Sequence, residues 1–170
     1  WISADIQSIQ TICTDHNLML IEDVCHALWW TYQWQKLGTF WDIAIFSFGR
    51  DKIISSVNGG ALLINNPKYQ SYSHQYQSIS KKIIIQNLLY IILWQLCKVT
   101  YRLGIGKLIY YIAGKYHLFP TIVTNDEKNC HYNDFDYAMP NCLADIALYE
   151  LSNIDEYNNK RKHNSKLYDT

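Results

Sequence analysis

Three side chains with complementary chemistry stand at the ends of apolar segments. Asp23 follows the run Leu18–Ile21, and Ser47 and Lys52 lie within the stretch IFSFGRDK at 45–52. A lysine amine forms a Schiff base with an aldehyde, a carboxylate keeps a pyridine nitrogen protonated, and a hydroxyl can bind phosphate. Pyridoxal 5'-phosphate requires one group of each kind, so these residues are candidates for holding that cofactor.

Each of these residues also has an ordinary structural explanation. Lys52, taken alone, would more often be a solvated surface lysine than a catalytic amine. Asp23 could cap the turn that follows it, and Ser47 could satisfy a local backbone group. We expect Gly59 and Gly60 to shape the turn that lets the lysine loop pack, a backbone role without direct chemistry.

The apolar pattern predicts a sheet that would bring the candidates together. Leu18–Ile21 is short and continuously apolar, as in a buried parallel strand, and ends at two carboxylates. Ile43–Phe48 and Ala61–Asn65 predict two further strands. This order indicates an α/β fold, in which ligands gather at the carboxyl ends of strands, where Asp23 and Lys52 both lie.

Helical spacing predicts two elements outside the strands. Ser3 is a candidate N-cap for a short amphipathic helix that His16 and Asn17 would end. At the other end of the chain, apolar residues keep helical spacing, which predicts one long helix over 141–168. The cationic stretch 160–162 in that helix is expected to be a solvated face.

Three stretches together resemble a known family. They are LIEDVCHAL at 20–28, LGTFWDIAIFSFGRDK at 37–52 and NGGALLINN at 58–66. Their order and spacing resemble the sugar aminotransferases of the DegT/DnrJ/EryC1/StrS type, which are fold-type I pyridoxal-phosphate enzymes. The resemblance covers nearly the whole chain and is strongest from Ile9 to Pro67.

The resemblance implies a role for each candidate. Lys52 matches the Schiff-base lysine, which also moves a proton between cofactor and substrate carbon. Asp23 matches the carboxylate on the pyridine nitrogen, and Ser47 matches a hydroxyl donor to the phosphate. His26 matches a position near the cofactor ring and its phenolic oxygen, although beside Ala27 and two tryptophans it could be only a packed ring.

The resemblance also implies an activity for the intact protein. It is a pyridoxal-phosphate-dependent transfer of an amino group from an amino acid such as glutamate to a nucleotide-linked keto sugar, for polysaccharide or glycoside synthesis. Lys52 speaks against the family subgroup that has histidine there and runs dehydration. The family further implies a homodimer with shared active sites.

Some positions depart from the family pattern. Trp29, Trp30 and Trp41 stand where small residues or glycine are common, which predicts a narrowed or reshaped pocket. The stretch 136–139 has Asp136 and Ala138 where the family often has the asparagine and arginine of Asn-Tyr-Arg-Met, which reach the neighbouring subunit's cofactor phosphate or substrate, so this stretch does not supply the groups for that contact. These departures favour an alternative, a non-catalytic module for binding or dimerisation.

The family's upstream half, with its glycine-threonine phosphate cradle and stacking aromatic residue, is not in the sequence, which opens at Trp1. We therefore expect a fragment that is inactive alone. Residues 1–80 would be the C-terminal half of the cofactor-binding large domain, 81–119 an apolar helical insert, and 120–170 a loop and helix leading into the small domain.

The insert at 81–119 admits more than one interpretation. Amides and cations interrupt its apolar sequence, which fits two amphipathic helices joined around Gly104 and Gly106 better than a membrane span. Packing in a core or a dimer interface is the ordinary explanation. Docking on a membrane surface is the main alternative, and a protein working through this segment is a second rival to the enzyme.

Composition excludes other classes. The chain has 15 basic and 15 acidic residues, so electrostatics gives no support for a nucleic-acid partner. Its five cysteines form no CxxC pair, which argues against both a zinc site and a disulfide framework. No metal is expected, and a reducing cytoplasm, with peripheral membrane contact as an addition, is the expected location.

Overall fold

The computed structural model describes residues 4–71, 75–120, 128–130 and 137–168. The chain divides into two compact units, one formed by Trp1–His74 with Asp145–Thr170 and the other by Gln75–Ala144. The three-part division expected from the sequence remains a prediction, because compactness alone does not identify the domains of a family.

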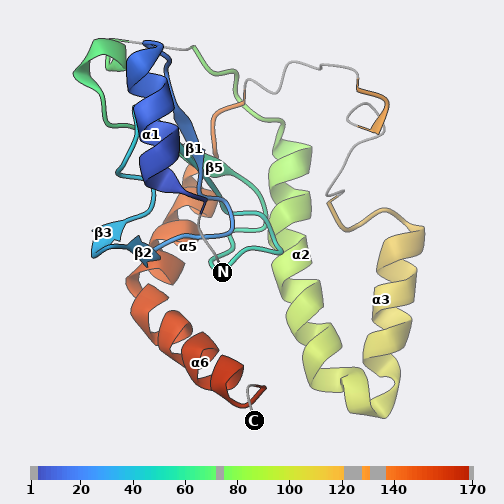
Figure 1. The fold of residues 1–170 in the computed structure, drawn as a ribbon. Helices are drawn as coiled ribbons and strands as arrows, with labels where there is room; N and C mark the ends of the chain where they lie inside the picture. Colours follow the sequence, from blue (N-terminus) through green and yellow to red (C-terminus); the bar gives the residue numbers. More distant parts are fainter. Residues whose placement is uncertain (1–3, 72–74, 121–127, 131–136, 169–170) are drawn as a thin grey trace. The chain divides into compact units, whose positions relative to one another are not determined.

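The first unit contains a small mixed sheet with one helix before it and helices from the end of the chain (Figure 1). Its elements are α1 (Ile6–Asp15), β1 (Ile21–Asp23), β2 (Thr31–Tyr32), β3 (Gln35–Lys36), β4 (Ile43–Ser47), β5 (Gly60–Ile64), η1 (Pro67–Tyr69), the part of α5 (Asn141–Ser152) from Asp145 on, and α6 (Ile154–Lys166). The sheet has the order β1-β4-β5, with β1 parallel and β5 antiparallel to β4. The hairpin β2–β3 forms a separate ribbon that the sequence pattern did not predict.

The first strand begins later than its apolar run suggests. The prediction at Leu18–Ile21 is wrong in its bounds, because the paired residues are Ile21–Asp23 and both carboxylates lie within β1. Leu18 and Met19 are exposed in the loop before the strand. The parallel pairing was predicted correctly, and so were the strands that became β4 and β5.

Helix α1 is present with a different cap. The Asp5 carboxylate accepts the N–H of Ser8 at 3.2 Å, so Asp5 is the N-cap, whereas the predicted Ser3 lies outside the described residues. The predicted end is confirmed at His16, after which Asn17 takes a φ of 51°. Such left-handed backbone ends helices readily at asparagine.

The core of the first unit is small and centred on the sheet. Its buried apolar residues come from α1, from β4, from the loops that follow β1 and β4, and from the helices after residue 145: Ile6, Val24, Ala44, Ile54, Val57, Ala147 and Ile154. The residues after β4 therefore do more than connect strands, because they fill the core beneath the candidate site.

The second unit contains a helical hairpin. Its helices are α2 (Lys81–Thr100) and α3 (Ile105–Lys115), joined by the short turn η2 (Tyr101–Leu103) and Gly104, as the sequence predicted. They lie side by side (Figure 1). Ser80 caps α2 by accepting the N–H of Ile83.

The predicted single helix over 141–168 is wrong, because the chain forms α5 (Asn141–Ser152) and α6 with a break at Asn153. The Ser152 hydroxyl and the Asn153 amide both donate to the carbonyl of Tyr149, at 2.6 and 3.0 Å. Short polar side chains that bond the preceding turn compete with the helix's own ladder, which explains the interruption.

Candidate active site

The predicted site residues lie at the carboxyl ends of β1 and β4. In the parallel pair, Asp23 lies opposite Ile45, so the carboxyl ends of β1 and β4 face the same way. Asp23 is the last residue of β1 and Ser47 the last of β4, and Lys52 follows in the next loop. The predicted gathering of these residues at the strand ends is therefore observed.

Lys52 is largely enclosed, with 14% of its side chain exposed. Its Nζ lies 2.9 Å from Nε2 of His26 and 3.3 Å from a carboxylate oxygen of Asp51. Asp51 is itself half exposed, so this ion pair is solvated and contributes little to stability. The amine is therefore held toward the end of β1 by the histidine that follows that strand.

Asp23 is set up to remain ionised. Hydrogen bonds from the thiol and the backbone N–H of Cys25 hold its pKa below the ordinary value, and the charges of His26 and Lys52 act in the same direction. Conversely, burial, followed by the hydrogen bond to Asp23, raises the pKa of the Cys25 thiol to about 11. A carboxylate and a neutral thiol thus stand next to the enclosed amine.

Ser47 has a free donor. Its oxygen accepts the N–H of Gly49 at 3.4 Å, and its hydroxyl proton has no acceptor among the described residues. A Cβ on Gly49 would meet the Asp51 carboxylate at 3.2 Å and the Ser47 oxygen at 3.5 Å. Glycine at 49 therefore keeps the space between Ser47 and the lysine loop open.

The loop that carries Lys52 is anchored on both sides. Phe48 donates its N–H to Gly59 and accepts the N–H of Ser56, at 2.9 and 3.0 Å. Ser56 is fully buried, and its hydroxyl donates to the Asn58 carbonyl. Gly59 has a φ of 109°, and a Cβ on Gly60 would meet the Phe46 carbonyl oxygen at 2.5 Å, which agrees with the backbone role predicted for this pair.

Glu22, which sequence reasoning did not single out, lies on the opposite face of β1 from Asp23. One of its oxygens accepts the N–H of Gly38 at 2.6 Å, while the other is buried with no partner in the described part of the chain. Burial raises the pKa of this carboxyl, against the effect of its hydrogen bonds. The adjacent acids of β1 thus have opposite pKa shifts. Alternation along a strand is the signal that separates them.

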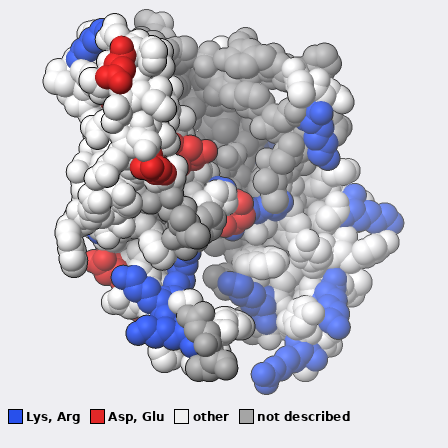
Figure 2. Space-filling view, in the orientation of Figure 1, with Lys and Arg blue, Asp and Glu red and all other residues white. Residues whose placement is uncertain are grey.

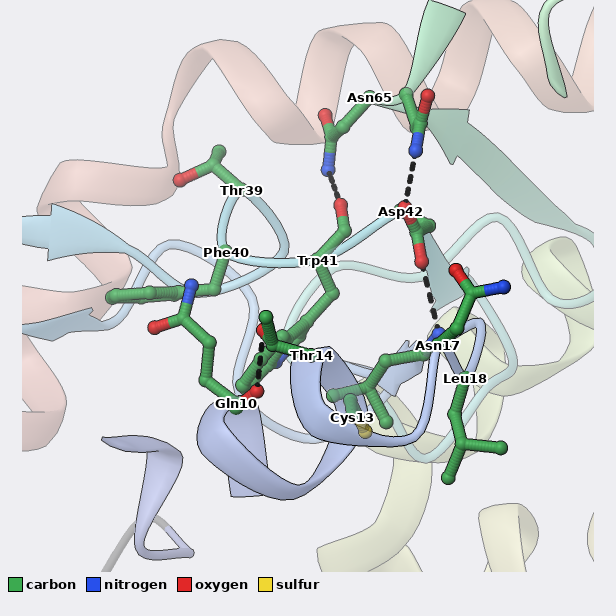
Figure 3. A pocket seen from close by; sticks show the side chains of 12 residues that line it. Gln10, Cys13, Thr14, Asn17, Leu18, Thr39, Phe40, Trp41, Asp42 and Asn65 are labelled. Carbon is green, nitrogen blue, oxygen red and sulfur yellow. Dashed lines mark hydrogen bonds between the residues drawn. The ribbon is translucent and has the colours of Figure 1, made fainter. Parts of the chain in front are cut away.

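The cavity drawn in Figure 3, of about 440 Å³, lies at the opposite end of the strands, where β1 and β4 begin and β5 ends. Asp42, which precedes β4, accepts the N–H of Leu20 and an amide N–H of Asn66, and Asn65 donates to the carbonyl of Trp41. The polar side chains of this cavity are thus largely used in hydrogen bonds that connect neighbouring loops. Trp41 lines this cavity, so it does not narrow the surroundings of Lys52 as predicted.

The Trp29 side chain contacts α6 and Lys36. Its indole N–H donates to Asp155 of α6 at 2.9 Å, and the Lys36 amine stands 4.3 Å from the ring centroid. Trp29 has a φ of 69°, in the left-handed region where glycine is the usual residue. This tryptophan therefore joins the β2–β3 ribbon to α6. Trp30 lines the same small pocket as Trp29.

The remaining departure from the family pattern lies in the second unit. Asp136 is outside the described residues. The N–H of Ala138 donates to the carbonyl of Gln77 at 2.9 Å, beside a bridge between Gln77 and Tyr137. The expected change in the contact across the subunits therefore stays a prediction.

Comparison with known proteins matches the segment that holds the candidate site. The model of the DegT/DnrJ/EryC1/StrS aminotransferase family matches residues 2–89, about half of the chain and all four candidate residues. The chain belongs to the DegT/DnrJ/EryC1/StrS aminotransferase family. The family resemblance and the α/β fold class predicted from the sequence are thereby confirmed.

Curated relatives of this family member match over a limited stretch. GDP-perosamine synthase of Vibrio cholerae is 41% identical over 64 residues, which are 38% of this chain and 17% of that protein. The Helicobacter pylori UDP-4-amino-4,6-dideoxy-N-acetyl-beta-L-altrosamine transaminase is 33% identical over 76 residues, 45% of this chain and 20% of the relative. The chain thus spans about a fifth of the length of these relatives.

Solved structures give similar coverage. The Helicobacter pylori aminotransferase PseC, involved in the biosynthesis of pseudoaminic acid, is 29% identical, with 46% of this chain and 23% of that chain covered and a TM-score of 0.38. An aminotransferase from Psychrobacter cryohalolentis is 30% identical, with 39% and 17% covered and a TM-score of 0.36.

Proposed function

We propose that this family member is part of a pyridoxal-phosphate-dependent aminotransferase that makes an amino sugar from a nucleotide-linked keto sugar. The observation that carries the proposal is the position of Lys52. Its amine is enclosed, lies 2.9 Å from His26, and shares a sheet edge with the ionised Asp23. A solvated cap would need none of these features.

The residues present fit the cofactor by their chemistry. Asp23 supplies an anion for a protonated pyridine nitrogen, Ser47 supplies for phosphate a hydroxyl donor that no described residue uses, and Lys52 supplies the amine. The bound cofactor would supply an aldehyde and an electron-withdrawing ring. The assignment of Lys52, Asp23, His26 and Ser47 to these roles rests on this fit and on the family match.

The chain's own groups would control the protons of the reaction. His26 lies within hydrogen-bonding distance of the Lys52 amine, so it can hold that amine in place and exchange a proton with it. Asp51 keeps an anionic charge beside the amine: burial acts to raise its pKa, but its own backbone N–H and the hydrogen bond and charge of Lys52 together lower it. The low pKa of Asp23 keeps its charge constant at neutral pH.

The substrate class is proposed from the curated relatives. Their names describe a GDP-linked perosamine and a UDP-linked amino sugar, so we infer a nucleotide-linked keto sugar as acceptor and an amino acid such as glutamate as donor. A homodimer with shared active sites in the cytoplasm fits the same proposal, as does use of the product for polysaccharide or glycoside synthesis.

The first test is attachment of the cofactor. The full-length protein, incubated with pyridoxal phosphate and reduced with borohydride, should carry a stable adduct that mass spectrometry locates at Lys52. The Lys52→Ala variant should lose it, and Lys68→Ala, which removes an exposed lysine of η1, should keep it. Labelling of surface lysines without preference for Lys52 would contradict the proposed role.

The second test is turnover. The full-length protein with pyridoxal phosphate, glutamate and a panel of nucleotide-linked keto sugars should release 2-oxoglutarate with at least one sugar. Lys52→Ala should reduce that rate by at least about a thousandfold, the scale of losing a nucleophile and a proton-transfer group together. A labelled Lys52 without turnover of any sugar would favour the non-catalytic alternative.

A further inference from the structure

The α2–α3 hairpin, residues 81–115, differs in charge from the rest of the chain. It has six cationic residues and no aspartate or glutamate, whereas the whole chain has equal numbers of each sign. The cations are Lys81, Lys82, Lys98, Arg102, Lys107 and Lys115. On the face drawn in Figure 2, blue side chains and no red ones lie over the turn between α2 and α3. The hairpin is thus locally cationic.

The same hairpin exposes large apolar side chains. In α3, Ile105, Leu108 and Ile112 form a stripe at helical spacing, with exposures of 49%, 58% and 42%. At the turn, Val99 and Leu103 are 81% and 75% exposed. An apolar stripe with cations near the turn and at the open end of the hairpin is the pattern of a helix pair that lies in a lipid headgroup region.

The hairpin does not need this outer surface to hold together. Contacts within the hairpin and to Phe119 are made by an aromatic cluster of Tyr90, Trp94, Tyr110 and Phe119, with ring centroids 5.3 to 6.3 Å apart. Gln86 donates to the carbonyls of His117 and Phe119. The outward apolar residues are therefore available to another surface.

Length argues for lying on a bilayer rather than crossing it. Among the described residues, the helical stretch Lys81–Leu103 is long and apolar enough to cross a membrane, with a mean hydropathy of 1.5. Between Lys82 and Lys98, however, only 15 residues are free of charge. They rise about 22 Å, less than the roughly 30 Å of a hydrocarbon core. α3, with 11 residues, is shorter still.

We propose that the α2–α3 hairpin docks this protein on an anionic lipid bilayer, with its apolar stripe in the headgroup region and its cations at lipid phosphates. This goes beyond the proposed aminotransferase function and does not depend on it. Charge selects a bilayer over a second copy of the chain, because two copies would bring six cations against six. The family match ends at residue 89, so most of the hairpin lies outside it.

The test is co-sedimentation of the full chain with vesicles. Binding to vesicles of equal phosphatidylcholine and phosphatidylglycerol should be at least about tenfold stronger than to phosphatidylcholine alone, and should weaken in high salt. The variant K98Q/R102Q/K107Q should bind about a hundredfold more weakly, at about fivefold for each cation. The matched control K160Q/R161Q/K162Q, which removes three cations from α6, should bind within about twofold of the unmodified chain.

A second variant keeps the test decisive if the first misfolds. V99S/L103S changes two exposed side chains, should retain the helicity seen by circular dichroism, and should lose at least about tenfold in binding. Equal binding to both vesicle types, or no effect of either variant, would overturn the proposal. So would resistance to carbonate extraction, which would indicate a spanning segment, or self-association through the hairpin without vesicle binding.

Discussion

At the carboxyl end of β1, two neighbouring acids have opposite pKa shifts because their side chains have different surroundings. Hydrogen bonds from Cys25 and the charges of His26 and Lys52 lower the pKa of Asp23, whereas burial raises the pKa of Glu22 against its hydrogen bond from Gly38. Asp23 therefore contributes stability above its unfolded pKa that is lost as pH falls through its lowered folded value. Glu22 behaves in the opposite way.

Glu22 gives a prediction about pH. Because its folded pKa is raised, its contribution to stability is complete below the unfolded pKa, near 4.5, and is lost as pH rises through the folded value. The free energy of unfolding, measured by urea denaturation, should fall over that interval. Glu22→Gln should remove this fall, because the amide does not titrate.

The control for Glu22 is Asp5, whose pKa is lowered chiefly by its hydrogen bonds with Ser8. Asp5→Asn keeps a capping oxygen and should alter the pH profile only at the acid end, below the ordinary pKa of aspartate. If Asp5→Asn removed the fall above pH 4.5 and Glu22→Gln did not, burial of Glu22 would be the wrong explanation.

At the scale of elements, the α2–α3 hairpin depends on one close approach. Gly106 is buried at the start of α3, and a Cβ there would collide with the Cys97 carbonyl oxygen and lie 3.0 Å from the Cα of Tyr101. These are backbone atoms, which cannot rotate away. The two helices can pack this closely only because residue 106 has no side chain.

Gly106→Ala should therefore destabilise the hairpin, by about 1–3 kcal/mol from overpacking, offset by up to about 1 kcal/mol of helix propensity. Thermal unfolding followed by circular dichroism measures the difference. Gly114→Ala is the matched control in the same helix, since a Cβ there meets nothing within 4 Å. It should stabilise by up to about 1 kcal/mol, and equal effects of the two variants would refute the contact.

At the scale of the whole molecule, the first unit is assembled from distant parts of the sequence. It combines residues before 75 with those from Asp145 onward. The bond from Trp29 to Asp155 is a direct link between these parts, and it joins residues 126 positions apart. The stability of the sheet is thus connected to the end of the chain.

The Trp29–Asp155 bond can be measured with a double-mutant cycle. Trp29→Phe and Asp155→Ala should each destabilise the first unit, and the coupling free energy should be about 0.5–1.5 kcal/mol, the range for one hydrogen bond. Trp34→Phe is the control, because Trp34 is 98% exposed and its replacement should change stability by less than about 0.5 kcal/mol. A coupling of zero would show that the bond contributes nothing to the stability of the first unit.

The sequence alone determined the family, the three strands of the main sheet and the two helices of the hairpin. These follow from local information. The apolar runs and their turn residues set β4, β5 and the break at Gly104, and the spacing of Asp23, Ser47 and Lys52 fixed which residues share a strand edge. The late start of β1 and the break at Asn153 were missed, because pairing partners and competing side-chain bonds override apolar spacing.

Only the tertiary structure decided what surrounds each of those residues. Three findings depend on which segments meet in space. They are the contact of the Lys52 amine with His26, the opposite pKa shifts of Glu22 and Asp23, and the position of Trp41 at the opposite end of the strands. Burial and charge are sums over neighbours from distant parts of the chain. Residue spacing does not contain these sums, so the enclosure of the Lys52 amine follows only from the tertiary structure.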